Sequence, residues 1–376
     1  MSVKTMRKTG ICVAVGVTLA LSLGLGGCSS NKPLASDATA KTATSLSDFG
    51  TMADLENAAQ AEGVLNIIAL PRDGANWGKI IDNFKAKYPK ITVNEQNPSG
   101  SSADEIAAAR TNKGLNTAPD VFNVGLSVAL QNTSYFAPYK VSTWNDIPDV
   151  LKESTGLYYG DYGGYMSVGI DTAKFPAPST IQDLLKPVYK GAVAINGDPT
   201  QAASAFAAIG LATIQNGGTL DDYTPGINFF QQMNQAGNFL KVDPTTATIE
   251  SGETPIVFDW DYLNATHTSE IPTWQTIVFP GQGYGGYYNE AINIDAPHPA
   301  AARLWQEYLY SDDVQNLFLQ SGAHPVRMDA MTKAGTIDAA AAAKLPAAPA
   351  TVQVPTAAQT SAAGTLLGQK WASAVG

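Results

Sequence analysis

The stretch VLNIIALPRDGANWGKIIDNFKAKYPKITVNEQ, residues 64–96, decides the fold of this chain. Residues 64–70 form a nearly continuous apolar run, which predicts a buried strand. Residues 77–88 carry large apolar side chains at helical spacing, and Pro89 ends the predicted helix. Residues 91–96 predict the next strand. A strand, a helix and a second strand in this order indicate a parallel sheet with a crossover helix.

The same alternation continues on both sides of this stretch. Residues 52–63 predict a helix that ends at Gly63, and residues 119–125 predict a third strand. Farther along, residues 191–197 and 254–260 predict two more strands, with helical segments between them. The whole pattern is typical of the α/β class.

Two extended segments, 158–171 and 285–294, interrupt the alternation. Both are rich in aromatic residues and glycine, which indicates extended chain that crosses between two lobes. We therefore predict an α/β fold of two lobes with two extended crossovers and a central cleft for a small ligand.

The N-terminal segment has the features of a secretory signal: a basic start, an apolar stretch and small residues. The tetrad Leu25-Gly26-Gly27-Cys28 resembles the bacterial lipobox. This resemblance implies that residues 1–27 are a lipoprotein signal peptide and that a lipid on Cys28 anchors the protein to the membrane. Residues 28–50 are rich in Ser, Thr and Ala and predict a disordered tether. The expected location is the extracytoplasmic face of the cell membrane.

Composition excludes several classes of function. The chain has 23 Lys plus Arg and 33 Asp plus Glu, a formal net charge of −10, which argues against a nucleic-acid partner. Two cysteines cannot make a disulfide framework, a Cys-rich zinc site or an iron–sulfur cluster. The G-x-S-x-G and H-E-x-x-H motifs and the phosphate loop are absent from the sequence. We expect no enzyme, no catalytic residues and no cofactor, with a secreted hydrolase as a remote alternative.

A family resemblance lies in APHPAAARLWQEYLYSDDVQNLFLQSGAHPVR, residues 296–327, with support from residues 118–125 and 178–195. Here the chain resembles the extracytoplasmic solute-binding proteins of bacterial ABC importers, within the cluster for iron(III), thiamine, polyamines and phosphonates. The resemblance implies the type II periplasmic-binding fold. In that fold, lobe one would comprise residues 51–165 plus 286–376, and lobe two residues 166–285. It also implies that the lobes close on a small-molecule ligand and that the permease subunits of the importer receive it. We expect a monomer.

Loops at the carboxyl ends of strands face the cleft in such a fold, so their polar residues are the first ligand-binding candidates. Serines that open a helix suit an anion or a carbonyl oxygen, although Ser is also a common N-cap. In lobe one these candidates are Arg72, Asp73, Asn76, Ser99, Ser101, Ser102 and Asn123. In lobe two, Thr200 and Ser204 open a helix in the same way.

The segment from Asp259 to Tyr262 carries most of the expected chemistry. Two carboxylates, Asp259 and Asp261, flank Trp260, which suits an organic cation through charge and cation–π attraction. Strand alternation places both carboxylates on one face and the indole on the other unless the strand has ended. On the crossings, the candidates are Asp161, Tyr162, Tyr284 and Tyr287. The pair Tyr287-Tyr288 also admits a metal, but we expect stacking on an organic ligand and no metal site.

The predicted ligand is an organic cation such as a polyamine or a thiamine-like amine. Arg72 and the serine-bearing helix starts favour the alternative of a phosphonate or another oxyanion, and iron(III) is a further alternative. A zwitterion such as an aminophosphonate would use both sets of residues.

Overall fold

The stretch that decides the fold has the predicted structure in the computed structural model, which describes residues 37–346 and 348–376. Strand β1 (Val64–Ile68), helix α3 (Trp77–Lys87) and strand β2 (Thr92–Gln96) follow one another, and the two strands pair in parallel. Helix α3 buries one apolar face because its large side chains recur every three or four residues. The predicted signal peptide and Cys28 lie outside the described residues.

Lobe one, as we use the name, is the part of the molecule around β1–β4. Beside the two-stranded β1–β2 sheet lie β3 (Val121–Gly125) and β4 (Phe136–Ala137), which pair antiparallel with β9 (Gln282–Asn293) in the larger sheet. Its helices are α2 (Met52–Glu62), α4 (Ser102–Thr111), α5 (Leu126–Gln131), α10 (Pro299–Leu309), α11 (Asp312–Gln320), α12 (Met328–Ala334) and α13 (Ala339–Ala342). Gly63 ends α2 in the left-handed conformation, as predicted.

Lobe two is the part around β6–β8. Strand β6 (Val193–Ile195) pairs in parallel with β7 (Ile256–Trp260), and β8 (Trp274–Ile277) lies on the same sheet. Its helices are α6 (Ala203–Gln215), α7 (Thr224–Gln235), α8 (Thr246–Ser251) and α9 (Asp261–Thr266). Helix α6 is almost wholly buried, because its sequence is apolar on every face.

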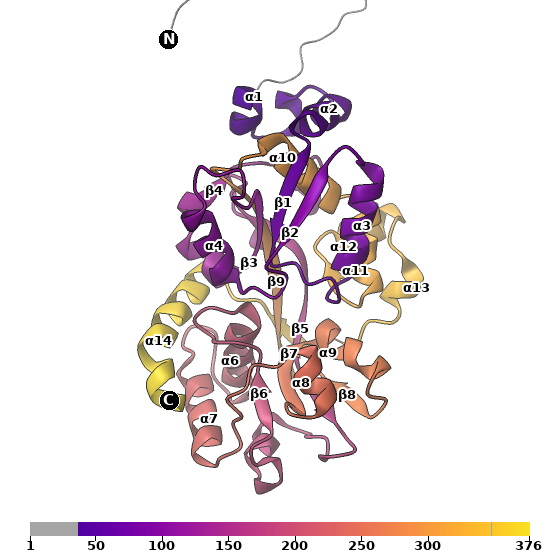
Figure 1. The fold of residues 1–376 in the computed structure, drawn as a ribbon. Coiled ribbons are helices and arrows are strands. Elements are labelled where there is room, and N and C mark those ends of the chain that lie inside the picture. Colours follow the sequence, from indigo (N-terminus) through magenta and orange to yellow (C-terminus); the bar gives the residue numbers. More distant parts are fainter. Residues whose placement is uncertain (1–36, 347) are drawn as a thin grey trace, which may run out of the picture. The chain divides into compact units, whose positions relative to one another are not determined.

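Two long strands connect the lobes, as predicted (Figure 1). Strand β5 (Tyr159–Asp171) pairs with β9 up to Tyr165 and, from Met166 on, with β7. The short strand β10 (His324–Pro325) adds to β5 from the lobe-one side. Since β5 and β9 belong to both lobes, any movement of one lobe against the other must bend these two strands.

Glycines make the crossing strands possible. A side chain on Gly163 would collide with the backbone carbonyl oxygen of Gly286. A side chain on Gly164 would collide with the carboxylate of Asp261. The glycine-rich composition that identified these segments in the sequence is therefore a packing requirement.

The predicted tether is too long. Residues Asp37–Thr42 form helix α1, and Ala40 and Ala43 are buried. The buried guanidinium of Arg303 donates from Nε to the carbonyl oxygen of Ala43 at 2.9 Å. Residues 37–50 therefore belong to the folded body, because a cation on α10 requires their carbonyl groups.

The prediction that lobe one includes all of residues 286–376 also differs from the structure, because the C-terminal residues contact lobe two. Strand β11 (Thr351–Gln353) pairs with the lobe-two end of β9, and α14 (Ala357–Val375) packs on α7 and on α5. We call residues 351–376 the C-terminal strap; its helix α14 appears in yellow at the left of Figure 1. The apolar face of this Ala-rich helix is buried against both lobes.

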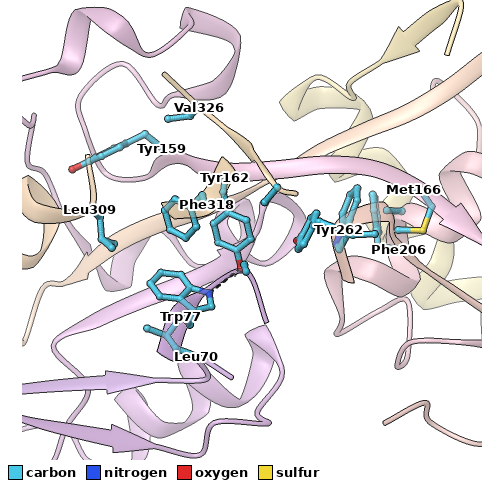
Figure 2. Packing of buried hydrophobic residues seen from close by; sticks show 14 of the residues in the cluster. Leu70, Trp77, Tyr159, Tyr162, Met166, Phe206, Tyr262, Leu309, Phe318 and Val326 are labelled. Carbon is cyan, nitrogen blue, oxygen red and sulfur yellow. Dashed lines mark hydrogen bonds between the residues drawn. The ribbon is translucent and has the colours of Figure 1, made fainter. Parts of the chain in front are cut away.

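The main hydrophobic core continues from one lobe to the other through aromatic rings (Figure 2). Tyr162, on β5, stacks on Phe318 with ring centroids 4.5 Å apart and meets Tyr262 edge-on at 5.7 Å. Trp77 donates from Nε1 to the Tyr162 hydroxyl at 3.1 Å. The lobes thus share a continuous core at the crossing.

Candidate ligand-binding site

A cavity of about 410 Å³ lies between the two lobes. Lobe one contributes the start of α5 around Ser127, and lobe two contributes the first turns of α6 with Ala203. The second crossing and the C-terminal strap complete the wall. This volume suits a small organic molecule.

The lobes are in contact across the cleft. The Thr246 hydroxyl lies 3.4 Å from Oδ2 of Asp73, the one predicted residue of the first loop that faces lobe two. Gly125, at the end of β3, lies directly against the Ala203 side chain, with no room for a Cβ atom. The structure is therefore a closed arrangement of the two lobes.

Aromatic rings dominate the cavity wall. They come from the first crossing, α6, the end of β7 and the second crossing: Tyr158, Phe206, Trp260, Tyr284, Tyr287 and Tyr288. The Trp260 ring lies on Gly286, where a Cβ would approach the indole to 2.5 Å. Among the described residues, the ionisable non-tyrosine side chains of the wall are Asp149 and Lys152, which pair with each other at 3.1 Å.

Asp259 lies just behind this wall. Its carboxylate accepts hydrogen bonds from Asn196 Nδ2 and from the Trp260 backbone N–H, both at 2.8 Å, and it is 7% exposed. Burial raises the pKa of Asp259 to about 6, and the hydrogen bonds oppose this shift. No ion pair to Asp259 occurs within residues 37–346 and 348–376. At pH 7 a buried negative charge therefore lies beside the aromatic cavity without a counter-ion.

The three residues Asp259, Trp260 and Asp261 point in different directions, because β7 ends at Trp260 and α9 begins at Asp261. Of the three, Trp260 lines the cavity. Asp261 accepts from the Tyr165 backbone N–H at 3.0 Å, and burial raises its pKa to about 7. The expected pair of carboxylates around an indole is thus wrong in its geometry, although Asp259 remains close.

A second acidic cluster is buried under the crossings. Asn123 donates from Nδ2 to Asp161 at 2.7 Å and to Glu290 at 3.0 Å, and its backbone N–H donates to Glu105 at 2.8 Å. Burial raises the pKa of each of these three carboxyl groups well above its ordinary value. Asn123 and Asp161, both predicted ligand contacts, instead hold the crossing strands to lobe one.

Several of the predicted contact residues lie outside the cavity wall and are engaged elsewhere. Arg72 forms ion pairs with Asp82 at 2.6 Å and with Glu95 at 3.0 Å on the surface. The Asn76 amide donates to the Leu317 carbonyl oxygen at 2.6 Å. These side chains support α3 and β2, and neither Arg72 nor Asn76 is part of the cavity wall.

Most of the predicted serine and threonine residues hydrogen-bond within the protein or are exposed, and they do not line the cavity. Ser101 caps α4, and the buried Ser102 hydroxyl accepts from the Gly125 backbone N–H at 3.1 Å. Ser99 is exposed, and the exposed Thr200 hydroxyl donates to Asp198 at 2.6 Å. Ser204 differs, because it is buried in the first turn of α6 and hydrogen-bonds the Asp259 carboxylate.

The cavity wall therefore contains three of the predicted residues, Trp260, Tyr284 and Tyr287. Tyr162 lies one layer deeper and stacks on Tyr288 with centroids 5.6 Å apart. Tyr288 also lines the cavity, although the sequence indicated only its pairing with Tyr287. The sequence does not predict Phe206 as a cavity residue, because α6 is apolar on every face and its pattern does not show which side chain faces the cavity.

Neither a metal site nor a membrane span emerges from the described part of the chain. Within it, no group of three or more His, Cys, Asp or Glu side chains is arranged to hold a metal ion. Helices that combine the length and the apolar character needed to cross a bilayer are likewise not found among the described residues.

A family model supports the class that the fold and the cavity define, a two-lobed binding protein. The model for bacterial extracellular solute-binding proteins matches residues 116–350, more than half of the chain. The chain belongs to this family, and its location is therefore extracytoplasmic. The prediction of a binding protein rather than an enzyme is confirmed. A search of curated proteins found no match.

Solved structures with the same fold include AgtB from A. tumefaciens R10 in complex with agropinic acid, with a TM-score of 0.64 and 16% identity over 83% of this chain and 98% of that one. An ABC transporter substrate-binding protein from Bradyrhizobium japonicum USDA 110 has a TM-score of 0.64 and 16% identity over 84% and 100%. A ferric binding protein from Campylobacter jejuni has a TM-score of 0.63 and 14% identity over 82% and 99%. These similarities confirm the type II periplasmic-binding fold.

Proposed function

We propose that this protein is the solute-binding component of an ABC importer and that its ligand is a small organic cation held in the aromatic cavity. The cavity closes between two lobes, as capture and delivery to a permease require. The predicted lipid on Cys28 would keep the protein on the outer face of the membrane, next to that permease.

The main support for a cationic ligand is the buried carboxyl group of Asp259, which has no counter-ion among the described residues. A buried carboxylate that is ionised at pH 7 and lacks a counter-ion is costly unless a positive charge approaches it. The faces of Trp260 and the tyrosines around it attract an ammonium group in addition. Arg72, which would favour an oxyanion, is paired with two carboxylates outside the cavity.

A thermal-shift screen tests the ligand class. The panel contains putrescine, spermidine, thiamine, ferric citrate, phosphate and 2-aminoethylphosphonate. A ligand at 100 times its Kd stabilises the fold by about 2.7 kcal/mol, a readable increase in melting temperature. We expect the amines to raise the melting temperature. If only phosphate, 2-aminoethylphosphonate or ferric citrate raised the melting temperature, the assignment of an organic cation as the ligand would be contradicted.

Matched variants connect this shift to the site. Asp259→Asn keeps the shape of the side chain and removes the charge, so the amine-dependent shift should decrease strongly. Asp313→Asn changes an exposed aspartate on α11 and should leave the shift unchanged.

The lipid anchor has a separate test. In a bacterial host the wild-type chain should partition into detergent with the membrane fraction. Cys28→Ser should remain in the aqueous phase. If wild type and Cys28→Ser divided equally between the detergent and aqueous phases, the proposal of a lipid on Cys28 would be contradicted.

A further inference from the structure

The C-terminal strap lies beyond residues 116–350, the part of the chain that matches the family model. It is nevertheless firmly attached to lobe two. Its strand β11 extends the sheet at β9, and Trp371 packs edge-on against Phe230 and Phe239 at 5.8 and 6.1 Å. Leu367 is completely buried in the same interface region.

The contact of the strap with lobe one is of another kind. Helix α14 meets α5, where Gly364 lies beside the Gln131 side chain. A Cβ atom on Gly364 would lie 3.4 Å from Gln131 Nε2. This is an ordinary van der Waals distance, so a methyl group would fit at Gly364 and a larger side chain would press on α5, whereas a large buried ring attaches α14 to α7.

The strap also forms part of the ligand cavity. Residues 354–357 and Thr360 belong to the wall between α5 and α6. Thr360 is 1% exposed, and its hydroxyl has no hydrogen-bond partner within the described residues. A buried hydroxyl without a partner at a cavity wall suits a polar group of the ligand.

Opening of the lobes must break one of the two attachments of the strap. The start of α5 lies against the start of α6 at Gly125 and Ala203, so separation of the lobes moves α5 away from α6. Helix α14 cannot remain on both α5 and α7 during that movement. The attachment to lobe two includes the buried Trp371 ring packed on Phe230 and Phe239, whereas Gly364 meets only the end of the Gln131 side chain, so we expect the contact with α5 to break first.

We propose that the C-terminal strap moves with lobe two and latches onto α5 of lobe one when the lobes close, which completes the cavity wall and favours the closed state. This inference uses the proposed function only in taking the cavity as the ligand site. Its test needs no ligand, so its failure is distinguishable from failure of the organic-cation assignment.

The test is a distance measurement between spin labels in the ligand-free full chain. Cys12→Ser and Cys28→Ser remove the native thiols, and Lys113→Cys and Lys241→Cys place one exposed label on each lobe. In this background, Gly364→Phe inserts a wedge between α14 and α5. We expect the ratio of open to closed molecules to increase at least threefold.

Gly368→Phe is the matched control. It makes the same change one turn farther along α14, at a position where a Cβ atom meets nothing within 4 Å. The open-to-closed ratio should remain that of the background protein. An equal effect of the two variants, no effect of Gly364→Phe, or a background protein without a closed population would overturn the latch.

Hydrogen exchange identifies the lobe that carries the strap. In Gly364→Phe the amides of α5 should exchange faster, while those of α7 keep their protection. Faster exchange in α7 with unchanged α5 would overturn the assignment of the strap to lobe two. If phenylalanine at this position prevents folding, Gly364→Gln supplies a smaller and more flexible wedge for both measurements.

Discussion

Replacing Asp259 by asparagine is expected to stabilise the ligand-free protein while it weakens ligand binding. The folded-state pKa of Asp259 is about 6 and its ordinary value is 3.8. A raised carboxyl pKa contributes stability that is present below about pH 4 and is lost as the pH rises through 6. At pH 8 the cost is about 3 kcal/mol, because each pKa unit corresponds to about 1.4 kcal/mol.

The assay is the melting temperature of the wild type and of Asp259→Asn between pH 4 and pH 8. The two proteins should melt at nearly the same temperature at pH 4. At pH 8 the variant should melt about 6 °C higher, since 1 kcal/mol corresponds to roughly 2 °C in a chain of this size. Asp313→Asn, on the surface, should show no such divergence. A variant that is less stable than wild type at pH 8, or a difference independent of pH, would refute the reasoning.

Three further substitutions test the packing around the site by thermal and denaturant unfolding. Asn123→Leu leaves the buried carboxyl of Asp161 without its amide donor and should cost about 2–4 kcal/mol; a loss under 1 kcal/mol would contradict the bridging role. Gly163→Ala places a methyl group against the Gly286 carbonyl and should abolish cooperative unfolding, and a native-like transition would argue against the close strand pairing. Trp77→Phe removes one hydrogen bond and part of an indole, with an expected loss of about 1–3 kcal/mol and an unchanged m-value.

The fold was predictable because its signals are local. The apolar run of β1 and the helical spacing in α3 each specify an element within a dozen residues. Glycine and aromatic residues identified both crossings for the same reason: glycine is required where β5 and β9 lie close together. The attachment of the strap was not predictable, since nothing in an Ala-rich helix specifies Phe230 as the partner of Trp371.

The site was only partly predictable, because its contacts join distant segments. Arg72 follows β1 as a ligand-binding residue would, yet Glu95, 23 positions farther along, neutralises it. The chain direction of Asp259, Trp260 and Asp261 changes where β7 becomes α9, and strand alternation cannot predict that point. Trp260 was predictable from the two carboxylates that flank it, and the crossing tyrosines from their place in glycine-rich extended segments.

The pairing of β3 with β9 governs when this protein can fold. Val121 lies opposite Ile292, so these paired strands of lobe one are separated by 171 positions, nearly half of the chain. Pairing over such a sequence distance slows folding, because the intervening chain must lose its freedom before the contact forms. During synthesis, β3 has no partner strand until residue 292 has been added. The sheet of lobe one that contains β3 is therefore completed only late in synthesis, a useful property in a protein that crosses a membrane before it works.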